Sequence, residues 1–194
     1  MPQAHTETER TAMRFHDDSN EKQRKDISER YEFRDIRKEE AERAAEIERI
    51  CFPPNEACSE EHMRERIEKA PELFLAAVDR QTGGMAGFLN GLATDEDSFR
   101  DEFFTDAGLH NPAGSNIMLL GLDVLPQHRG QGLAGELVAQ YVRRERERGR
   151  KMLLLTCLQG KVKMYEKMGF TDRGIADSAW GKEEWHEMSR RIEA

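Results

Sequence analysis

Hydrophobic and polar side chains follow two different periods along the chain, and these periods predict both strands and helices. Alternation from Tyr31 to Ile36 is typical of a strand, and the nearly continuous apolar runs at 117–124 and 152–158 are typical of strands buried on both faces. Strands are predicted at residues 31–36, 73–78, 85–92, 117–124, 152–158, 170–176 and 184–192. Helices are predicted where apolar residues recur three and four positions apart, from Ala41 to Cys51, from Ser59 to Pro71, from Gly132 to Gly149 and from Val162 to Met168. The order β-α-α-β-β-β-α-β-α-β-β predicts an α/β fold with a mixed sheet.

Two segments fall outside this pattern. Residues 1–30 hold acids and bases nearly in balance with few apolar side chains between them, which predicts a flexible arm or a short surface helix. We therefore divide the chain into a charged arm, residues 1–30, and a folded domain, residues 31–194. Residues 93–115 form a long polar connection with one short helix expected around its phenylalanines. Connections of this length are often lids or binding loops.

Composition and charge narrow the functional classes. The chain has 194 residues and a formal net charge of −8, so a single acidic domain is expected, and nucleic acid is excluded as a partner because its phosphates need a basic surface. The three cysteines, Cys51, Cys58 and Cys157, form no C-x-x-C pair, so neither a disulfide framework nor a metal site is predicted. The N-terminus has no apolar stretch of signal-peptide length, and no run of about eighteen apolar residues occurs. We expect a cytoplasmic protein that does not enter a membrane.

A glycine-rich loop between a buried strand and an amphipathic helix is the most informative segment. Gly130 and Gly132 follow the strand 117–124, and the helix opens directly after Gly132. Glycine lets a ligand approach the backbone closely, and the free amides and dipole of a first helical turn favour a bound phosphate or pyrophosphate. Arg129 adds a positive charge beside the loop. The segment therefore predicts a phosphate site in which the amides of residues 130–134 hold the ligand.

Two other phosphate motifs fit the same loop less well. Residues 130–135 satisfy the dinucleotide pattern G-x-G-x-x-G, which would imply a nicotinamide-dependent oxidoreductase. In that motif the glycines directly follow the strand and an acid ends the next strand. Here residues 126–129 intervene, and the next strand ends in Thr-Cys-Leu at 156–158. A Walker loop is not present, because no Gly-Lys-Ser/Thr follows.

The loop and a second motif together resemble the GNAT superfamily of N-acetyltransferases. Residues 129–134, Arg-Gly-Gln-Gly-Leu-Ala, are similar to its R/Q-x-x-G-x-G/A signature, and residues 164–170, Met-Tyr-Glu-Lys-Met-Gly-Phe, are similar to its Y-E-K-x-G-F element. The resemblance covers residues 31–192 and implies a mixed, mostly antiparallel sheet with splayed central strands flanked by helices. It also implies acetyl-CoA as cosubstrate, bound by Leu122, Asp123, Val124, Arg129, Gly130, Gln131, Gly132, Leu133, Ala134 and Gly135.

Within the superfamily, the chain looks most like bacterial relatives of arylalkylamine (serotonin) N-acetyltransferase. Residues 51–60 and the long connection carry that similarity. The two relay histidines of that enzyme correspond to Met118 and Leu120, so its proton relay is absent, and Leu158 stands where many members have an asparagine. The resemblance implies direct transfer in a ternary complex to a primary amine of a small molecule, arylalkylamine-like or a polyamine. A monomer or a homodimer is expected.

Acetyl transfer from a thioester needs a partner for the developing oxyanion and a proton for the leaving thiolate. The family motif makes Tyr165 the expected general acid, because a phenol is protonated at neutral pH. A backbone N–H of the splayed strand, on Leu122 or Val124, is expected to stabilise the oxyanion.

The base is left open by the sequence. Glu56, on the loop after the first long helix, is expected near the amine as base or counter-charge, with Asp123, His110 or a chain of waters as alternatives. Core or lid packing is expected of Trp180, Trp185 and the phenylalanines of the long connection, with the lining of an aromatic or apolar substrate pocket as the alternative. Because the relay histidines are missing, a non-catalytic acyl-CoA-binding module is one alternative function, and the nicotinamide-dependent oxidoreductase is the other.

Overall fold

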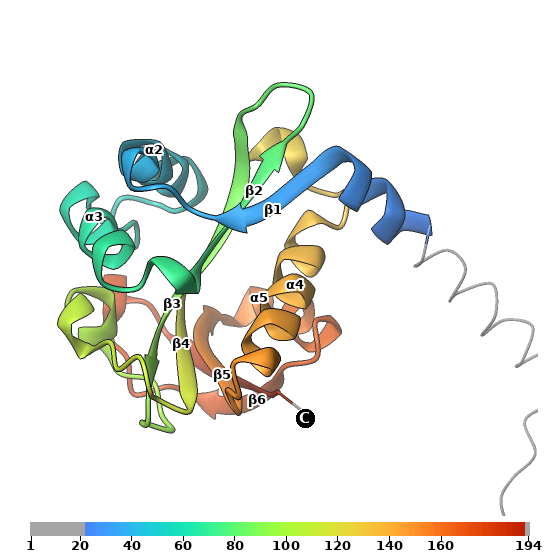
Figure 1. Ribbon diagram of the computed structural model, residues 1–194. Helices are drawn as coiled ribbons and strands as arrows, with labels where there is room; N and C mark the ends of the chain where they lie inside the picture. Colours follow the sequence, from blue (N-terminus) through green and yellow to red (C-terminus); the bar gives the residue numbers. More distant parts are fainter. Residues whose placement is uncertain (1–21, 193–194) are drawn as a thin grey trace, which may run out of the picture.

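A computed structural model describes residues 22–192 and contains a seven-stranded sheet in the order β1-β2-β3-β4-β5-β7-β6 (Figure 1). Neighbouring strands are antiparallel except β4 and β5, which run parallel. The strands are β1 (Tyr31–Asp35), β2 (Phe74–Asp79), β3 (Met85–Thr94), β4 (Asn116–Val124), β5 (Met152–Leu158), β6 (Thr171–Ile175) and β7 (Trp185–Arg191). The helices between them are α2 (Ala41–Cys51), α3 (Glu60–Lys69), α4 (Leu133–Glu147) and α5 (Gln159–Lys167). This order and the mixed, mostly antiparallel sheet confirm the predicted fold.

Helices cover both faces of the sheet. On one face, Ile47 of α2 and Ile67 of α3 pack with Phe88 of β3 in a smaller core. On the other face, Leu137 and Tyr141 of α4 belong to a larger core, and the buried Tyr141 hydroxyl donates to the backbone of η2 (Pro71–Leu73) at 3.0 Å. Within residues 22–192, no helix is long and apolar enough to span a membrane.

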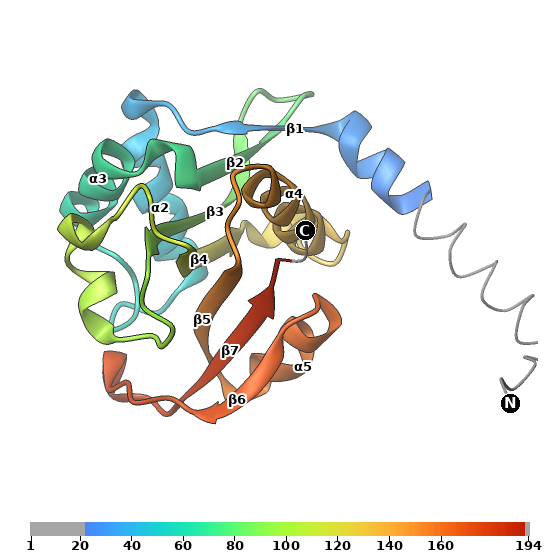
Figure 2. The same cartoon turned by 60° about the horizontal axis from the view of Figure 1, so that its bottom comes forward.

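The central strands β4 and β5 separate after a short stretch of pairing. Residues 116–118 of β4 pair with residues 152–154 of β5, and from there each strand continues with its antiparallel neighbour, β4 with β3 and β5 with β7. The register between β3 and β4 shifts at Leu120, and an extra residue of this kind bends the strand that carries it. The strands therefore diverge (Figure 2), which confirms the predicted splay.

Local differences from the predicted elements lie at the connections. The long connection contains two short 3-10 turns, η3 (Asp101–Phe104) and η4 (Ala107–Leu109), where a single helix was expected. α5 begins directly after β5, earlier than predicted, because its polar first residues, Gln-Gly-Lys at 159–161, give no apolar signal. α3 begins as predicted, with the Ser59 side chain accepting a hydrogen bond from the His62 amide at 3.1 Å.

Residues 22–30 are helical and lead directly into β1 (Figure 1). Ile27 is 6% exposed and belongs to the larger core. Gln23 donates to the Gln131 carbonyl at 3.3 Å, and Arg30 donates to the Gln131 side chain at 2.5 Å. A short helix was one of the two states predicted for the charged arm, and this part of it packs beside the glycine loop. Residues 1–21 of the arm lie outside the described residues.

Replacing Ile27 by alanine should lower the free energy of unfolding by about 2 kcal/mol or more, because a buried isoleucine is lost from the core. Ile50→Ala is the matched control, since Ile50 is 48% exposed and its loss should change stability by less than about 0.5 kcal/mol. Urea unfolding of both variants checks this. Equally small effects would show that residues 22–30 do not belong to the cooperative unit.

Candidate functional site

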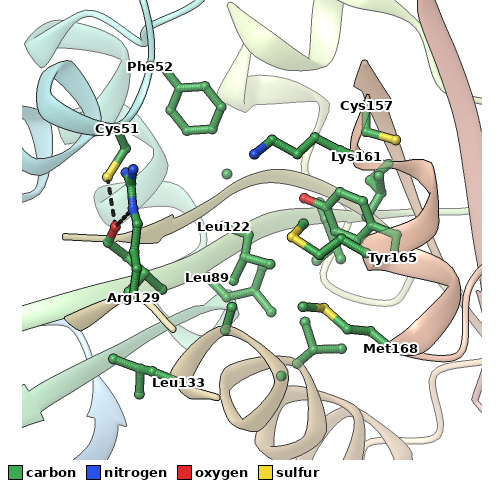
Figure 3. Close-up of a pocket in the computed structure, with 18 of the residues that line it drawn as sticks. Cys51, Phe52, Leu89, Leu122, Arg129, Leu133, Cys157, Lys161, Tyr165 and Met168 are labelled. Atoms are coloured by element: carbon green, nitrogen blue, oxygen red, sulfur yellow. Dashed lines mark hydrogen bonds between the residues drawn. The ribbon is translucent and has the colours of Figure 1, made fainter. Parts of the chain in front are cut away.

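A cavity of about 1150 Å³ lies where β4 and β5 diverge. Residues 119–122 of β4 and 155–158 of β5 line it, together with the first turn of α4, the end of α2 and one side of α5. Figure 3 shows Cys51 and Phe52 on one side of this space and Tyr165 across from them. The splayed strands have thus opened a chamber in the middle of the sheet.

One edge of β4 is open to the cavity. Leu125 donates its amide to β3 at 2.9 Å, and because backbone groups alternate along a strand, Asp123 also directs its amide and carbonyl toward β3. The backbone groups of Leu122 and Val124 therefore face the opposite edge, where β5 has departed. The Val124 carbonyl accepts a hydrogen bond from Arg129 Nε at 2.7 Å on this edge. The open amides and carbonyls can pair with an extended ligand in place of a strand.

The glycine loop closes one end of the cavity. Gly130 and Gly132 have φ angles of +72° and +87°, a left-handed conformation that glycine adopts without strain. A Cβ at Gly130 would meet no atom within 4 Å, so the face of the loop is accessible. The first-turn amides of α4 have no helical acceptor and are free to bind an anion. Of the loop residues predicted to bind the cosubstrate, Gly130, Gly132, Leu133, Ala134 and Gly135 line the cavity.

Gln131 and Arg129 have different surroundings from the rest of the loop. The Gln131 side chain is held by Arg30, from the helix 22–30, and is not among the cavity-lining residues. Arg129 lines the cavity, but its guanidinium turns back to the end of β4, where the Cys51 thiol also lies 3.5 Å from the Val124 carbonyl (Figure 3). The positive charge of Arg129 is therefore anchored at the strand end.

Tyr165 extends from α5 into the wall of the cavity, and its hydroxyl points into the open space (Figure 3). Its ring packs edge-on against Phe170 with the ring centres 5.6 Å apart. Burial raises the pKa of the Tyr165 phenol, and the nearby Cys157 and Asp123 raise it further. The phenol is therefore held in its protonated form, the state a proton donor needs.

The side of the cavity opposite the glycine loop is aromatic. Trp180 stacks on Phe104 with ring centres 4.9 Å apart, and both line the cavity, as does Trp185. The Trp180 indole N–H donates to the Glu56 carbonyl at 3.1 Å. Glu56 also lines the cavity, and partial burial, followed by the charge of Glu183, raises the pKa of its carboxyl. Phe104, Trp180 and Trp185 thus follow the alternative expectation, that of lining a pocket, whereas Phe99 and Phe103 pack in the core.

A buried pair of carboxyl groups beside the cavity was not predicted. Glu48 of α2 is 3% exposed and lines the cavity, and Asp123 of β4 is fully buried behind it. Burial raises the pKa of both groups, and the charge of Glu48 raises the pKa of Asp123 further. Arg66 and a hydrogen bond shared with Asp123 oppose the rise at Glu48. Asp123 was predicted beside the coenzyme, but its carboxyl faces α2 rather than the cavity. The sequence did carry a signal for Glu48, which stands three and four positions from Cys51 and Ala44 on the apolar face of its helix.

His110, one alternative for the base, lies away from the cavity. Its Nδ1 accepts the Ala93 amide at 3.2 Å, its Nε2 lies 3.1 Å from Glu72, and its side chain is 4% exposed. Burial lowers the pKa of the imidazole. These contacts fix the long connection to β3, so His110 has a structural role.

The open edge of β4 and the glycine loop line the same cavity. The acetyltransferase (GNAT) family matches residues 32–170 of the chain. The chain belongs to this family. It is an acetyl-CoA-dependent acyltransferase, and this decides against both the nicotinamide-dependent oxidoreductase and the non-catalytic binding module.

Solved structures share this GNAT fold at low sequence identity. The loading GNATL domain of CurA from Lyngbya majuscula has a TM-score of 0.72 at 15% identity, over 84% of this chain and 98% of that one. The ribosomal-protein-S18-alanine N-acetyltransferase from Escherichia coli has a TM-score of 0.61 at 19% identity, over 84% and 95%. A phosphinothricin acetyltransferase from Sinorhizobium meliloti, in complex with acetyl-CoA, has a TM-score of 0.60 at 16% identity, over 83% and 88%. No curated protein matches the chain.

Replacing Asp123 by asparagine should stabilise the protein, and more at pH 8 than at pH 5. Because burial raises the pKa of Asp123 and Glu48 in the folded state, the folded protein binds more protons than the unfolded chain above the ordinary carboxyl pKa, so it loses stability as the pH rises. Asparagine removes one of these titrations. We expect a gain in melting temperature of about 3 °C or more at pH 8.

Thermal unfolding of Asp123→Asn at the two pH values measures this gain. Asp97→Asn is the control, since Asp97 is exposed in the long connection and its replacement should leave the melting temperature unchanged. A loss of stability in Asp123→Asn at pH 8 would contradict the inference that the buried carboxyl pair destabilises the fold at high pH.

Proposed function

We propose that this GNAT acyltransferase acetylates a primary amine of a small molecule, which attacks the thioester of acetyl-CoA directly while both are bound. The supporting observation is a cavity that extends from the glycine loop to the stacked rings of Phe104 and Trp180. Because one cavity is lined by both the loop and these rings, we place both substrates in it together. Holding two reactants in the correct orientation contributes about 7–11 kcal/mol to lowering a barrier.

In this proposal the pyrophosphate of acetyl-CoA binds the amides of residues 130–134, at the N-terminus of α4. Its pantetheine arm extends along the open edge of β4 and pairs with the backbone of Leu122 and Val124. An N–H of the same edge donates to the oxyanion that develops on the thioester carbonyl, where a fixed donor is most effective. The positive φ angles and the open face at Gly130 support this placement, because a side chain there would lie where the phosphates approach.

Tyr165 donates its proton to the departing thiolate of coenzyme A. Its hydroxyl points into the cavity from the wall opposite Cys51 and Phe52 (Figure 3), and its raised pKa keeps the proton in place until a strong base forms. A thiolate is such a base.

The acceptor side favours an arylalkylamine over a polyamine. Phe52, Phe104 and Trp180 offer aromatic faces to a ring, and Glu56 supplies a carboxylate for the cationic form of the amine. The net charge of −8 also favours a cationic substrate at the stage of encounter. A polyamine, by contrast, would need several carboxylates along its length.

The test is release of free thiol from acetyl-CoA in the presence of arylalkylamines, polyamines, amino acids and peptides. We expect the highest kcat/KM with an arylalkylamine. A preference for spermidine would contradict the aromatic acceptor, and no release with any amine would contradict amine acetylation altogether.

Gly130→Ala should weaken acetyl-CoA binding about tenfold or more, because its Cβ would project into the space assigned to the phosphates. Gly83→Ala is a closely matched control. Gly83 lies in the β2–β3 turn with φ of +70°, and a Cβ there also meets no atom within 4 Å. Both variants carry the same backbone strain, of about 1–2 kcal/mol. Calorimetric titration with acetyl-CoA should therefore show weakened binding in Gly130→Ala alone, and equal affinities would place the phosphates elsewhere.

Tyr165→Phe should lower kcat tenfold or more while leaving acetyl-CoA affinity nearly unchanged, because only the proton donor is lost. Tyr141→Phe removes a hydroxyl from a tyrosine outside the cavity, whose hydrogen bond to η2 affects stability. That control should retain the wild-type kcat. Steady-state kinetics of the two variants distinguish the roles, and an unchanged kcat in Tyr165→Phe would remove Tyr165 from the mechanism.

A further inference from the structure

The missing histidine relay leaves β4 without a base, since Met118 and Leu120 are apolar. Glu48 is the acid of the cavity wall that is most deeply buried, at 3% exposure, and it comes from α2 rather than from the strand. Its Oε1 accepts the Cys58 amide at 3.2 Å, which fixes the orientation of the carboxyl. Its Oε2 has no hydrogen-bond partner among the described residues. The proton that Glu48 shares with Asp123 satisfies this buried oxygen, so the two carboxyls act as a pair.

Three polar side chains converge at Gly121, beside the cavity. A Cβ at this position would lie 2.9 Å from Asn90 Nδ2 and from Asp123 Oδ2, and 3.3 Å from Glu48 Oε2. Within residues 22–192, none of these three atoms has a hydrogen-bond partner. Only glycine leaves them room, and Gly121 itself lines the cavity. The cluster thus brings two carboxyls and one amide together at the wall where β4 is open.

The two carboxyls cannot both be ionised at low cost, because like charges this close repel each other in a dry environment. Arg66, which is 3% exposed, offsets one negative charge and donates to the Asn90 side chain at 3.4 Å. Glu48 lines the cavity and Asp123 does not, so the proton that the pair retains is best placed on Asp123. The charged and titratable groups that face the pair are Arg66 from α3, Cys58 from the α2–α3 loop, Cys51 from the end of α2 and Arg129, which reaches Cys51.

Glu48 and Tyr165 line the same cavity. Tyr165 lies on the α5 side, and the charge of Asp123 is one of those that act on its phenol. Glu48 lies on the α2 side, next to Cys51 and Phe52. A proton donor and a proton acceptor therefore stand on opposite walls of the space assigned to the thioester.

We propose that Glu48 is the catalytic base, which takes a proton from the acceptor amine, and that Asp123 is a positioning residue, which holds the one proton that the pair retains. This inference rests on the proposed amine acetylation. The amine nitrogen bonds to the acetyl carbon as its proton passes to Glu48, the carbon–sulfur bond breaks, and the thiolate takes the proton of Tyr165. Exchange with solvent then returns a proton from Glu48 to the Tyr165 phenolate, so that the net products are the acetylated amine and free coenzyme A.

Glu48→Gln tests this proposal with the amine that wild-type protein acetylates best. We expect kcat to fall about a hundredfold or more, while acetyl-CoA affinity changes less than threefold. The acidic limb of the pH profile of kcat should also disappear. Glu46→Gln is the matched control, since Glu46 lies on the same helix, is exposed and pairs with Arg43 on the surface. Asp123→Asn should move the acidic limb of the pH profile of kcat to higher pH, because Glu48 then loses the hydrogen bond by which protonated Asp123 lowers its pKa. A purely structural role for Asp123 would leave the limb in place.

Carboxyl 13C NMR of the wild-type protein supplies a readout that does not depend on folding of the variants. The Glu48 resonance should shift when the amine is added to the acetyl-CoA complex, and an unmoved resonance would overturn the assignment. Normal kcat and an intact acidic limb in Glu48→Gln would also overturn the assignment of Glu48 as the catalytic base. That result would not contradict the proposed amine acetylation. Thiol release by no amine, in contrast, would overturn the proposed function and the base together.

Discussion

The parallel pairing between β4 and β5 ends after three residue pairs, and the whole site depends on that interruption. Backbone amides and carbonyls inside a sheet need partners, and an edge that loses its strand must pair with something else. At its far end, β4 meets this demand internally, through the guanidinium of Arg129 on the Val124 carbonyl. Along the rest of the open edge, a ligand can take the place of the strand. Full pairing of β4 and β5 would remove both the cavity and the backbone that an extended cosubstrate needs.

The glycine loop is held in place by side chains of the helix 22–30, while its Gly130 stays accessible. Gln131 is bonded by Gln23 and Arg30, and Ile27 packs in the core beside Gly132. These contacts come from the helix 22–30, whose Gln23, Arg24 and Ile27 also line the cavity. A loop fixed before binding loses less conformational entropy when a ligand arrives. The arm is therefore part of how the site is organised, although its composition is that of a solvated segment.

The sequence predicted those features that depend on neighbouring residues. The periods of hydrophobic positions gave the strands and helices in order, and the glycines at 130 and 132 together with the motif around Tyr165 indicated the family. Features that depend on distant residues were not predictable in this way. Glu48 becomes chemically distinct only because β4 brings Asp123 against it, and the aromatic wall exists only because the β6–β7 connection brings Trp180 onto Phe104. For the arm, a low apolar content concealed Ile27, since one well-placed side chain is enough to anchor a short helix.

The buried carboxyl pair is a poor way to stabilise a domain. Replacing buried ionisable groups by well-packed apolar side chains is often neutral or stabilising, so the stability of this fold gives no reason for two acids behind the cavity. The proposed reaction does give a reason for these two acids. Low polarity around the cavity raises the pKa of Tyr165 and keeps its phenol protonated, while mutual repulsion and Arg66 leave the carboxyl pair with a single charge. In the proposed reaction, the same burial prepares a protonated donor on one wall and a charged proton acceptor on the other.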